Sequence, residues 1–316
     1  MRKIVAIGLA IAATLAGPLG CLGPAASRAT LRIAVLPVLD SLPFYVAEAE
    51  EFYDEEGITV ELVAVSSAAE RDQLLQAGQV DMLITDLVAL ELANREQIQI
   101  VAVRYAMVPT DTYAQFRVLA APGTAFETVR DLAGISIGVS EGTVIEYVTD
   151  RLLTAEGLPS DQIETVAVPR IPDRMSLLGA GELPAATLPE PLATLAMQQG
   201  ARVIIDDTSH REYSCSIVAV RPELLDTQPM TVRRLLRALD RAIAAINADK
   251  KAWSGLLSEK QLVPPALGAD YSLPDYPNSA VPPETQVADA AAWLSDKGLL
   301  DEPPAYAQIV NADFLR

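Results

Sequence analysis

Hydrophobic and polar positions alternate along the chain in a way that predicts short strands separated by amphipathic helices. Runs of apolar, β-branched residues at 31–37, 58–65, 81–84 and 98–105 predict strands. The stretches between them carry apolar residues at helical spacing, and the first such helix is expected to continue to Gly57. Such alternation is typical of parallel α/β units. The chain is therefore expected to fold as an α/β protein.

The same order of elements returns further along the chain. Strands are expected at 135–139 and 163–168, each followed by a helix. The segment Leu74–Val80, LLQAGQV, matches Leu177–Leu183, LLGAGEL. We therefore expect two lobes with one plan and a crevice between them, where ligands bind beyond the carboxyl ends of the strands.

The C-terminal part adds further elements. A strand at 216–220 precedes a helix at 231–247 with one continuous apolar side. The stretch 263–284 is rich in proline and polar residues, which predicts a surface loop. A last helix is expected at 285–297.

The first twenty residues have the pattern of a signal peptide. Arg2 and Lys3 precede an apolar run that is too short to span a bilayer, and Gly17-Pro18 follows it. Gly20 before Cys21 indicates cleavage and lipidation at Cys21, with residues 21–30 as a linker. The alternative is a secreted protein cleaved near residue 25. Both readings place the mature protein outside the cytoplasm, and the first anchors it to the cell membrane.

Charge and cysteine content exclude several classes of function. The 316 residues include 24 Lys and Arg and 42 Asp and Glu, so the net charge is −18. This negative charge disfavours nucleic acid and anionic membrane surfaces as partners. Cys21 and Cys215 are the only cysteines, too few for a disulfide scaffold or a cysteine-rich metal site. We expect neither a metal nor a cofactor.

Several motifs in order along the mature chain resemble one known family, the solute-binding proteins of bacterial ABC importers that serve nitrate, sulfonates, taurine and thiamine-precursor pyrimidines. The matching segments are 33–41 followed by Pro-Phe-Tyr-Val-Ala at 43–47, Leu75-x-x-Gly78-x-x-Asp81, 137–143, 185–193 and 310–314.

This resemblance implies a periplasmic-binding-protein type II fold, with two α/β lobes, two crossing segments and a cleft. Lobe one would comprise 31–116 plus 215–316 and lobe two 117–214, with crossings near 114–120 and 212–220. A monomer would close on a small solute and deliver it to an ABC permease and its ATPase, without chemistry on the solute.

Candidate ligand-binding residues follow from the expected strand ends. Ser67, Asp86 and Ser140 have helix capping as an equal alternative, and backbone N–H groups of Gly142 and Thr143 could hold an electron-rich ligand atom. The full set is Asp40, Ser41, Ser66, Ser67, Thr85, Asp86 and Tyr105 in lobe one, and Ser140, Glu141, Gly142, Thr143, Arg170, Arg174, Leu188 and Glu190 in lobe two.

The charged candidates bear on the solute. Pro189 and Pro191 restrict the backbone of Glu190, which could bind a ligand N–H or be held by its own helix dipole. Arg170 and Arg174 could hold an anion or lie on a solvated helix face. Because acids outnumber these arginines, the expectation leans to a vitamin-like heterocycle, such as a pyrimidine precursor or flavin. Nitrate, sulfonate or taurine is the alternative.

A serine hydrolase is the alternative from another class. Gly138-Val139-Ser140-Glu141-Gly142 matches the Gly-x-Ser-x-Gly elbow. Asp206 or Asp207 and then His210 complete the order serine, acid, histidine. This reading requires His210, the only histidine, to reach Ser140.

Overall fold

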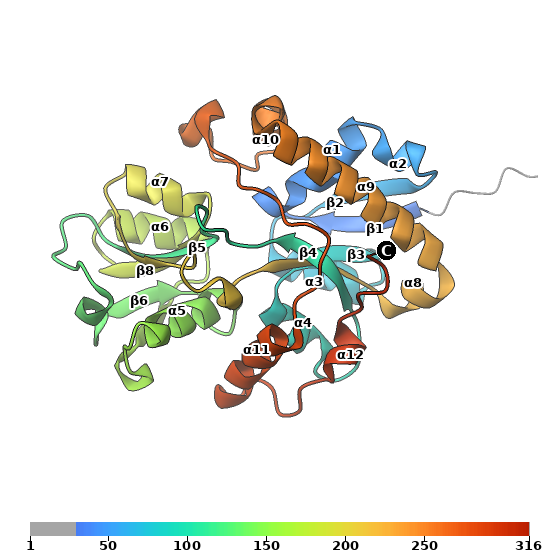
Figure 1. Ribbon diagram of the computed structural model, residues 1–316. Coiled ribbons are helices and arrows are strands. Elements are labelled where there is room, and N and C mark those ends of the chain that lie inside the picture. The colour runs from blue at the N-terminus through green and yellow to red at the C-terminus, as the bar shows by residue number, and fades with distance from the viewer. Residues whose placement is uncertain (1–29, 316) are drawn as a thin grey trace, which may run out of the picture.

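The computed structural model describes residues 30–315, without the side chains of residues 269 and 270. The predicted signal peptide and Cys21 lie outside the described residues. Two five-stranded sheets lie side by side (Figure 1). In order, the first contains β2 (Thr59–Ala64), β1 (Thr30–Val35), β3 (Met82–Thr85), β10 (Ser216–Val220) and β4 (Val101–Met107). The second contains β7 (Glu164–Ala167), β6 (Ser136–Val139), β8 (Ala185–Pro189), β5 (Phe116–Ala120) and β9 (Arg202–Asp206).

The two sheets share one strand plan, as the internal repeat predicted. In each sheet the fourth strand, β10 or β5, runs antiparallel to both of its neighbours. The parallel units expected from the sequence are therefore parts of mixed sheets. The physical reason is connectivity, because β10 and β5 each follow a crossing from the other sheet. Such a strand begins at the crossings, where the parallel strands of its sheet end. It therefore runs in the opposite direction to those strands.

Helices cover both faces of each sheet (Figure 1). We call each sheet with its helices a lobe. On the first lobe one face carries α1 (Leu42–Ala49), α2 (Phe52–Glu55), α8 (Pro222–Thr227), α9 (Pro229–Ala248) and α10 (Ser254–Glu259). Its other face carries α3 (Ala68–Gln76), α4 (Leu87–Asn94), α11 (Glu284–Asp296) and α12 (Tyr306–Ile309). The second lobe has α5 (Val144–Ala155) on one face, and α6 (Ile171–Gly179) and α7 (Leu192–Gln198) on the other.

The repeated sequence segments form the same turn in both lobes. Gly78 follows α3 with a φ of 68°, and Gly181 follows α6 with a φ of 73°. Both angles lie in the left-handed region, which glycine adopts without a Cβ penalty, so the two helices end in the same way. One expectation for the first helix is wrong. Glu51 also takes a left-handed φ of 58°, which breaks the helix expected to reach Gly57 into α1 and α2.

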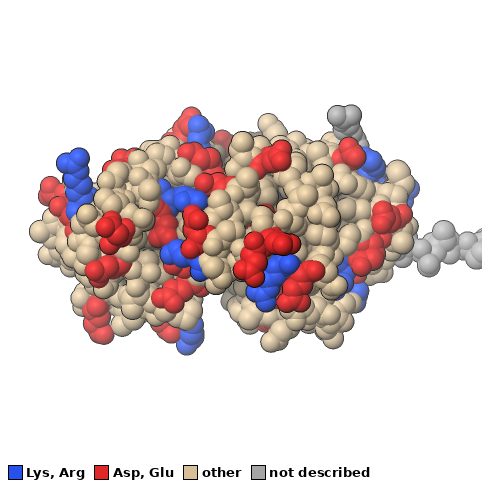
Figure 2. All heavy atoms as spheres, turned by 90° about the horizontal axis from the view of Figure 1, so that it is seen from below, with Lys and Arg blue, Asp and Glu red and all other residues tan. Residues whose placement is uncertain are grey.

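The lobes are connected by the segments 108–115, between β4 and β5, and 207–215, between β9 and β10. The crossings expected near 114–120 and 212–220 therefore begin and end earlier, because 116–120 and 216–220 pair within the sheets. Figure 2 shows a narrow indentation between the two halves, with acidic side chains spread over both. Among the described residues, no helix is both long and apolar enough to cross a bilayer.

On one side of the indentation the lobes share packing. α5 of the second lobe lies against α4 and α11 of the first, and their apolar side chains form one core cluster. Polar contacts reinforce this junction. Trp293 Nε1 donates to Asp150 Oδ2 at 2.8 Å, and Lys297 pairs with Glu146 at 2.7 Å.

Candidate functional site

The carboxyl ends of the parallel strands of the two lobes lie on either side of the two crossing segments. In the first lobe, β1 leads into the short helix η1 (Leu39–Ser41), and β3 leads into α4. In the second lobe, β6 leads into α5, and β8 leads to Glu190 and α7. We describe the side chains of these strand ends as the candidate site.

Asp40 is half-buried at the first strand end. Burial raises the pKa of its carboxyl, and the nearby Ser216 hydroxyl counteracts this in part. The Tyr276 hydroxyl fixes η1 by donating to the Leu39 carbonyl at 2.7 Å. Ser41 is fully buried and donates to the Leu36 carbonyl at 2.7 Å, so its hydroxyl shapes the loop.

Two other candidates of the first lobe, Ser67 and Asp86, act as helix caps. The Asp86 carboxylate accepts from the Ala89 N–H at 2.9 Å, and Ser67 accepts from the Glu70 N–H at 3.2 Å. The Glu70 carboxylate accepts from the N–H and the hydroxyl of Ser66, at 2.8 and 2.7 Å. Thr85 is buried at the end of β3.

In the second lobe the turn before α5 is held by its own side chains. The Gly142 N–H donates to the Glu146 carboxylate at 2.6 Å, so the donor expected to face a ligand is occupied. Thr143 caps α5, accepting from the Ile145 N–H, while its hydroxyl donates to the Ser140 carbonyl. Glu141 and Thr143 are exposed.

The two arginines differ sharply from each other. Arg170 is 78% exposed and lies 3.4 Å from Asp173, as expected for a solvated face. Arg174 is fully buried, contrary to that expectation. Its Nη1 donates to Ser140 Oγ at 2.9 Å and to the Val168 carbonyl at 3.0 Å. Among residues 30–315, its Nε and Nη2 have no hydrogen-bond partner, and burial lowers its pKa to about 10. It is a buried cation with donors to spare.

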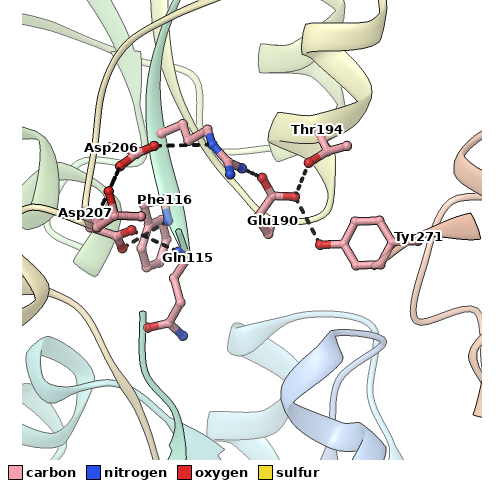
Figure 3. Close-up of polar contacts among 9 residues, drawn as sticks. Gln115, Phe116, Glu190, Thr194, Asp206, Asp207 and Tyr271 are labelled. Atoms are coloured by element: carbon pink, nitrogen blue, oxygen red, sulfur yellow. Dashed lines mark hydrogen bonds and ion pairs between the residues drawn. The ribbon is translucent and has the colours of Figure 1, made fainter. Parts of the chain in front are cut away.

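Glu190 lies at the interface between the lobes, and its side chain is only 2% exposed. It forms an ion pair with Arg117 and accepts from Thr194 Oγ1 at 2.7 Å. The Tyr271 hydroxyl of the first lobe also donates to it, at 3.2 Å (Figure 3). Leu188, two residues earlier, is fully buried among apolar side chains in the core of the second lobe.

Sequence reasoning missed four residues beside this site. Arg117 lies in β5, Tyr271 lies in the proline-rich loop, and Tyr113 lies in the first crossing. Gln115 has a buried amide oxygen without a partner, and Figure 3 shows its side chain pointing away from Asp207. Crossings and loops carry no periodic pattern or motif, so no sequence signal pointed to these residues.

Tyr105 of β4 contacts α11. Its hydroxyl donates to Gln286 Oε1 of α11 at 2.7 Å, and burial raises its pKa. It lines a cavity of about 440 Å³ between α11 and the two crossings.

The residues of the hydrolase alternative do not form a triad. The Ser140 hydroxyl donates to the Pro169 carbonyl at 3.1 Å, and His210 Nε2 contacts Glu156 at 2.8 Å. Asp207 is fully buried, where its carboxylate accepts from the N–H groups of Gln115 and Phe116. That reading is wrong because each group is engaged elsewhere. Within residues 30–315, no cluster of His, Cys, Asp and Glu could hold a metal ion.

A family model described as NMT1/THI5 like matches residues 39–252, which is more than half of the chain. The chain belongs to the NMT1/THI5-like family. None of the curated proteins matches this sequence.

Solved structures share the fold of this NMT1/THI5-like protein. The alkanesulfonate-binding protein SsuA from Xanthomonas axonopodis pv. citri, bound to MOPS, is 19% identical with a TM-score of 0.73, over 91% of this chain and 100% of the other. The aliphatic sulphonate binding protein SsuA from Escherichia coli is 19% identical with a TM-score of 0.76, over 89% and 92%. The desulfurization enzyme DSZB is 19% identical with a TM-score of 0.69, over 91% and 98%. The type II binding-protein fold expected from the sequence is confirmed, and enzymes also use it.

Proposed function

We propose that this protein is the extracytoplasmic solute-binding protein of an ABC importer, and that it binds a small organic solute between its lobes. The observation that carries this proposal is the pairing of two lobes, each with its strand ends at the crossings. A solute held there contacts both lobes only when they are closed, so its binding energy favours the closed form. The closed monomer would then dock on the permease, which works with its ATPase.

The charges at the site favour a solute with an anionic head group, such as a sulfonate. Four acids at the expected strand ends, Asp40, Asp86, Glu141 and Glu190, disfavoured an anionic solute as long as they were uncompensated. Glu190 is neutralised by Arg117, and Asp86 is engaged as a helix cap. The cation Arg174 is buried without an acidic partner and has two unused donor nitrogens. Such a cation costs free energy unless an anion approaches it.

The similar structures support the same class, since two of them are named as sulfonate-binding proteins. The vitamin-like heterocycle and nitrate remain competing solutes. Taurine, which carries an ammonium group as well as a sulfonate, is a further candidate of the anionic class.

Catalysis is a weaker alternative. A thiolate nucleophile requires an accessible cysteine with a lowered pKa. Cys215, the only cysteine among residues 30–315, is 4% exposed, and burial raises its pKa. We therefore propose binding without chemical change of the solute.

Calorimetry of the purified mature protein tests the proposal, with ethanesulfonate, taurine, nitrate, a hydroxymethyl-aminopyrimidine and riboflavin as probes. Mass spectrometry of co-purifying molecules extends the search beyond this panel. We expect saturable binding of a sulfonate. Binding of the pyrimidine or riboflavin alone would overturn the anionic class, and turnover of a bound compound would overturn the binding role.

A further inference from the structure

A cavity lies at the hinge, between the end of β4, the two crossings and α11. Its volume is about 440 Å³, within the range of about 300–1,000 Å³ that small-molecule sites occupy. Three segments line it. The end of β4 and the first crossing contribute Tyr105 and Val108, the second crossing contributes Arg211–Tyr213, and the start of α11 contributes Pro283 to Asp289.

The position of this cavity couples it to the movement of the lobes. Both crossings must bend when the lobes rotate relative to each other, because they are the connections between the sheets. α11 joins the same movement, since its Asp289 accepts from Tyr147 and Arg151 of α5, each at 2.7 Å. A molecule that fills the cavity therefore contacts three elements whose spacing changes with closure.

The lining indicates the chemistry of the occupant. Tyr105, Tyr213 and Val108 offer aromatic and apolar surface, which suits a single aromatic ring. Arg211 and Glu212 offer opposite charges among the same lining residues, with side chains 54% and 60% exposed.

The guanidinium of Arg211 is available to a ligand at little cost. Its partner Asp111 lies 2.8 Å away but is 82% exposed, and exposed ion pairs of this kind contribute little to stability. The Gln286 carboxamide is held by Tyr105, so the wall beneath is preformed.

We propose that the hinge cavity binds a small aromatic zwitterion, with its ring beside Tyr105 and Tyr213, its carboxylate on Arg211 and its ammonium on Glu212. Occupation of the cavity would shift the balance between open and closed lobes. It would therefore change the affinity for the solute, and the solute would change its affinity by the same factor. The coupling rests on the proposed function, whereas binding to the cavity does not.

Calorimetry on the mature, solute-free protein tests the site with L-phenylalanine, phenethylamine and phenylpropionate. We expect L-phenylalanine to bind at least tenfold more tightly than either singly charged probe. Thr285→Trp, which fills the cavity from the exposed start of α11, should abolish binding. Arg211→Ala should weaken L-phenylalanine and phenylpropionate but leave phenethylamine unchanged. Arg130→Ala, an exposed arginine outside the lining, is the matched control.

The proposal is overturned if L-phenylalanine gives no heat at millimolar concentration, or if Thr285→Trp leaves its binding intact. The coupling is measured separately, as the solute affinity with and without saturating L-phenylalanine. If the solute affinity is unchanged, the two sites are not coupled, although the hinge cavity still binds L-phenylalanine. If no solute binds, the proposed function is wrong, whereas the calorimetric result for L-phenylalanine still tests the hinge cavity.

Discussion

The Tyr271 hydroxyl of the first lobe donates a hydrogen bond to Glu190 Oε2 of the second lobe, at an O–O distance of 3.2 Å. Tyr271 lies in a loop whose Leu267 and Tyr276 pack into the core of the first lobe. Glu190 follows β8 and is fixed by Arg117 and Thr194. Across the indentation from the apolar junction of α4, α5 and α11, the lobes thus meet through a hydrogen bond. We expect the side with this hydrogen bond to open, since on the other side the apolar side chains of α4, α5 and α11 form one core cluster.

Removing the Tyr271 hydroxyl should weaken solute binding without unfolding the protein. A hydrogen bond to a charged group contributes about 1.5–3 kcal/mol, so Tyr271→Phe should raise the solute Kd by about 10- to 150-fold. Calorimetry and a stopped-flow dissociation rate check this. The matched control is Tyr306→Phe, whose hydroxyl bonds the Pro282 carbonyl within the first lobe. Equal Kd values for Tyr271→Phe and the unchanged protein would contradict the closing role of the contact.

Replacing Arg174 should lower the affinity for an anionic solute without lowering the stability of the protein. The buried, unpaired guanidinium carries a desolvation cost, so Arg174→Met should leave the melting temperature unchanged or raised. The same variant should lose at least tenfold in affinity for an anionic solute. The control is Arg170→Met. Because Arg170 is exposed, this substitution should change neither the melting temperature nor the solute affinity. Full affinity in Arg174→Met would refute a role for this cation in solute binding.

Glu91 should make stability depend on pH. Its side chain is buried in α4, and burial raises its pKa from 4.5 to about 7. Between these two values the folded protein holds a proton that the unfolded chain releases, so stability should fall as the pH rises through this interval. At pH 8, Glu91→Gln should be more stable than the unchanged protein by about 1–3 kcal/mol, and the difference should vanish below pH 4.5.

Urea unfolding at pH 4, 6 and 8 measures this effect. Glu96→Gln serves as the control, because Glu96 is an exposed glutamate near the end of the same helix. A pH-independent difference between Glu91→Gln and the unchanged protein would show that the Glu91 carboxyl does not titrate in this range.

The predicted lipid on Cys21 can be tested by fractionation. Cys21→Ala should release the mature protein from the membrane fraction, since the lipid chain on Cys21 is the expected anchor. Immunoblots of membrane and soluble fractions measure the distribution, with Cys215→Ala as the control. If Cys21→Ala and the unchanged protein distribute alike, the secreted alternative is favoured.

Local sequence was informative wherever one short segment determines its own structure. The capping roles of Ser67 and Asp86, and the strand Ser216–Val220, depend on residues close in sequence. The residues of the candidate site were harder to predict from the sequence. Arg170 and Arg174 are four residues apart on one helix and could not be distinguished, yet one is exposed and the other fully buried.

The sequence by itself determined the alternation of strands and helices, the repeated plan of two lobes and the family resemblance, because periodicity, caps and turn glycines act over a few residues. Only the tertiary structure decided that β5 and β10 run antiparallel. It also brought Tyr271 to Glu190, 81 residues apart in sequence, and left Arg174 buried without an acid. These features depend on which distant segments the crossings bring together, and that is set by the packing of whole lobes.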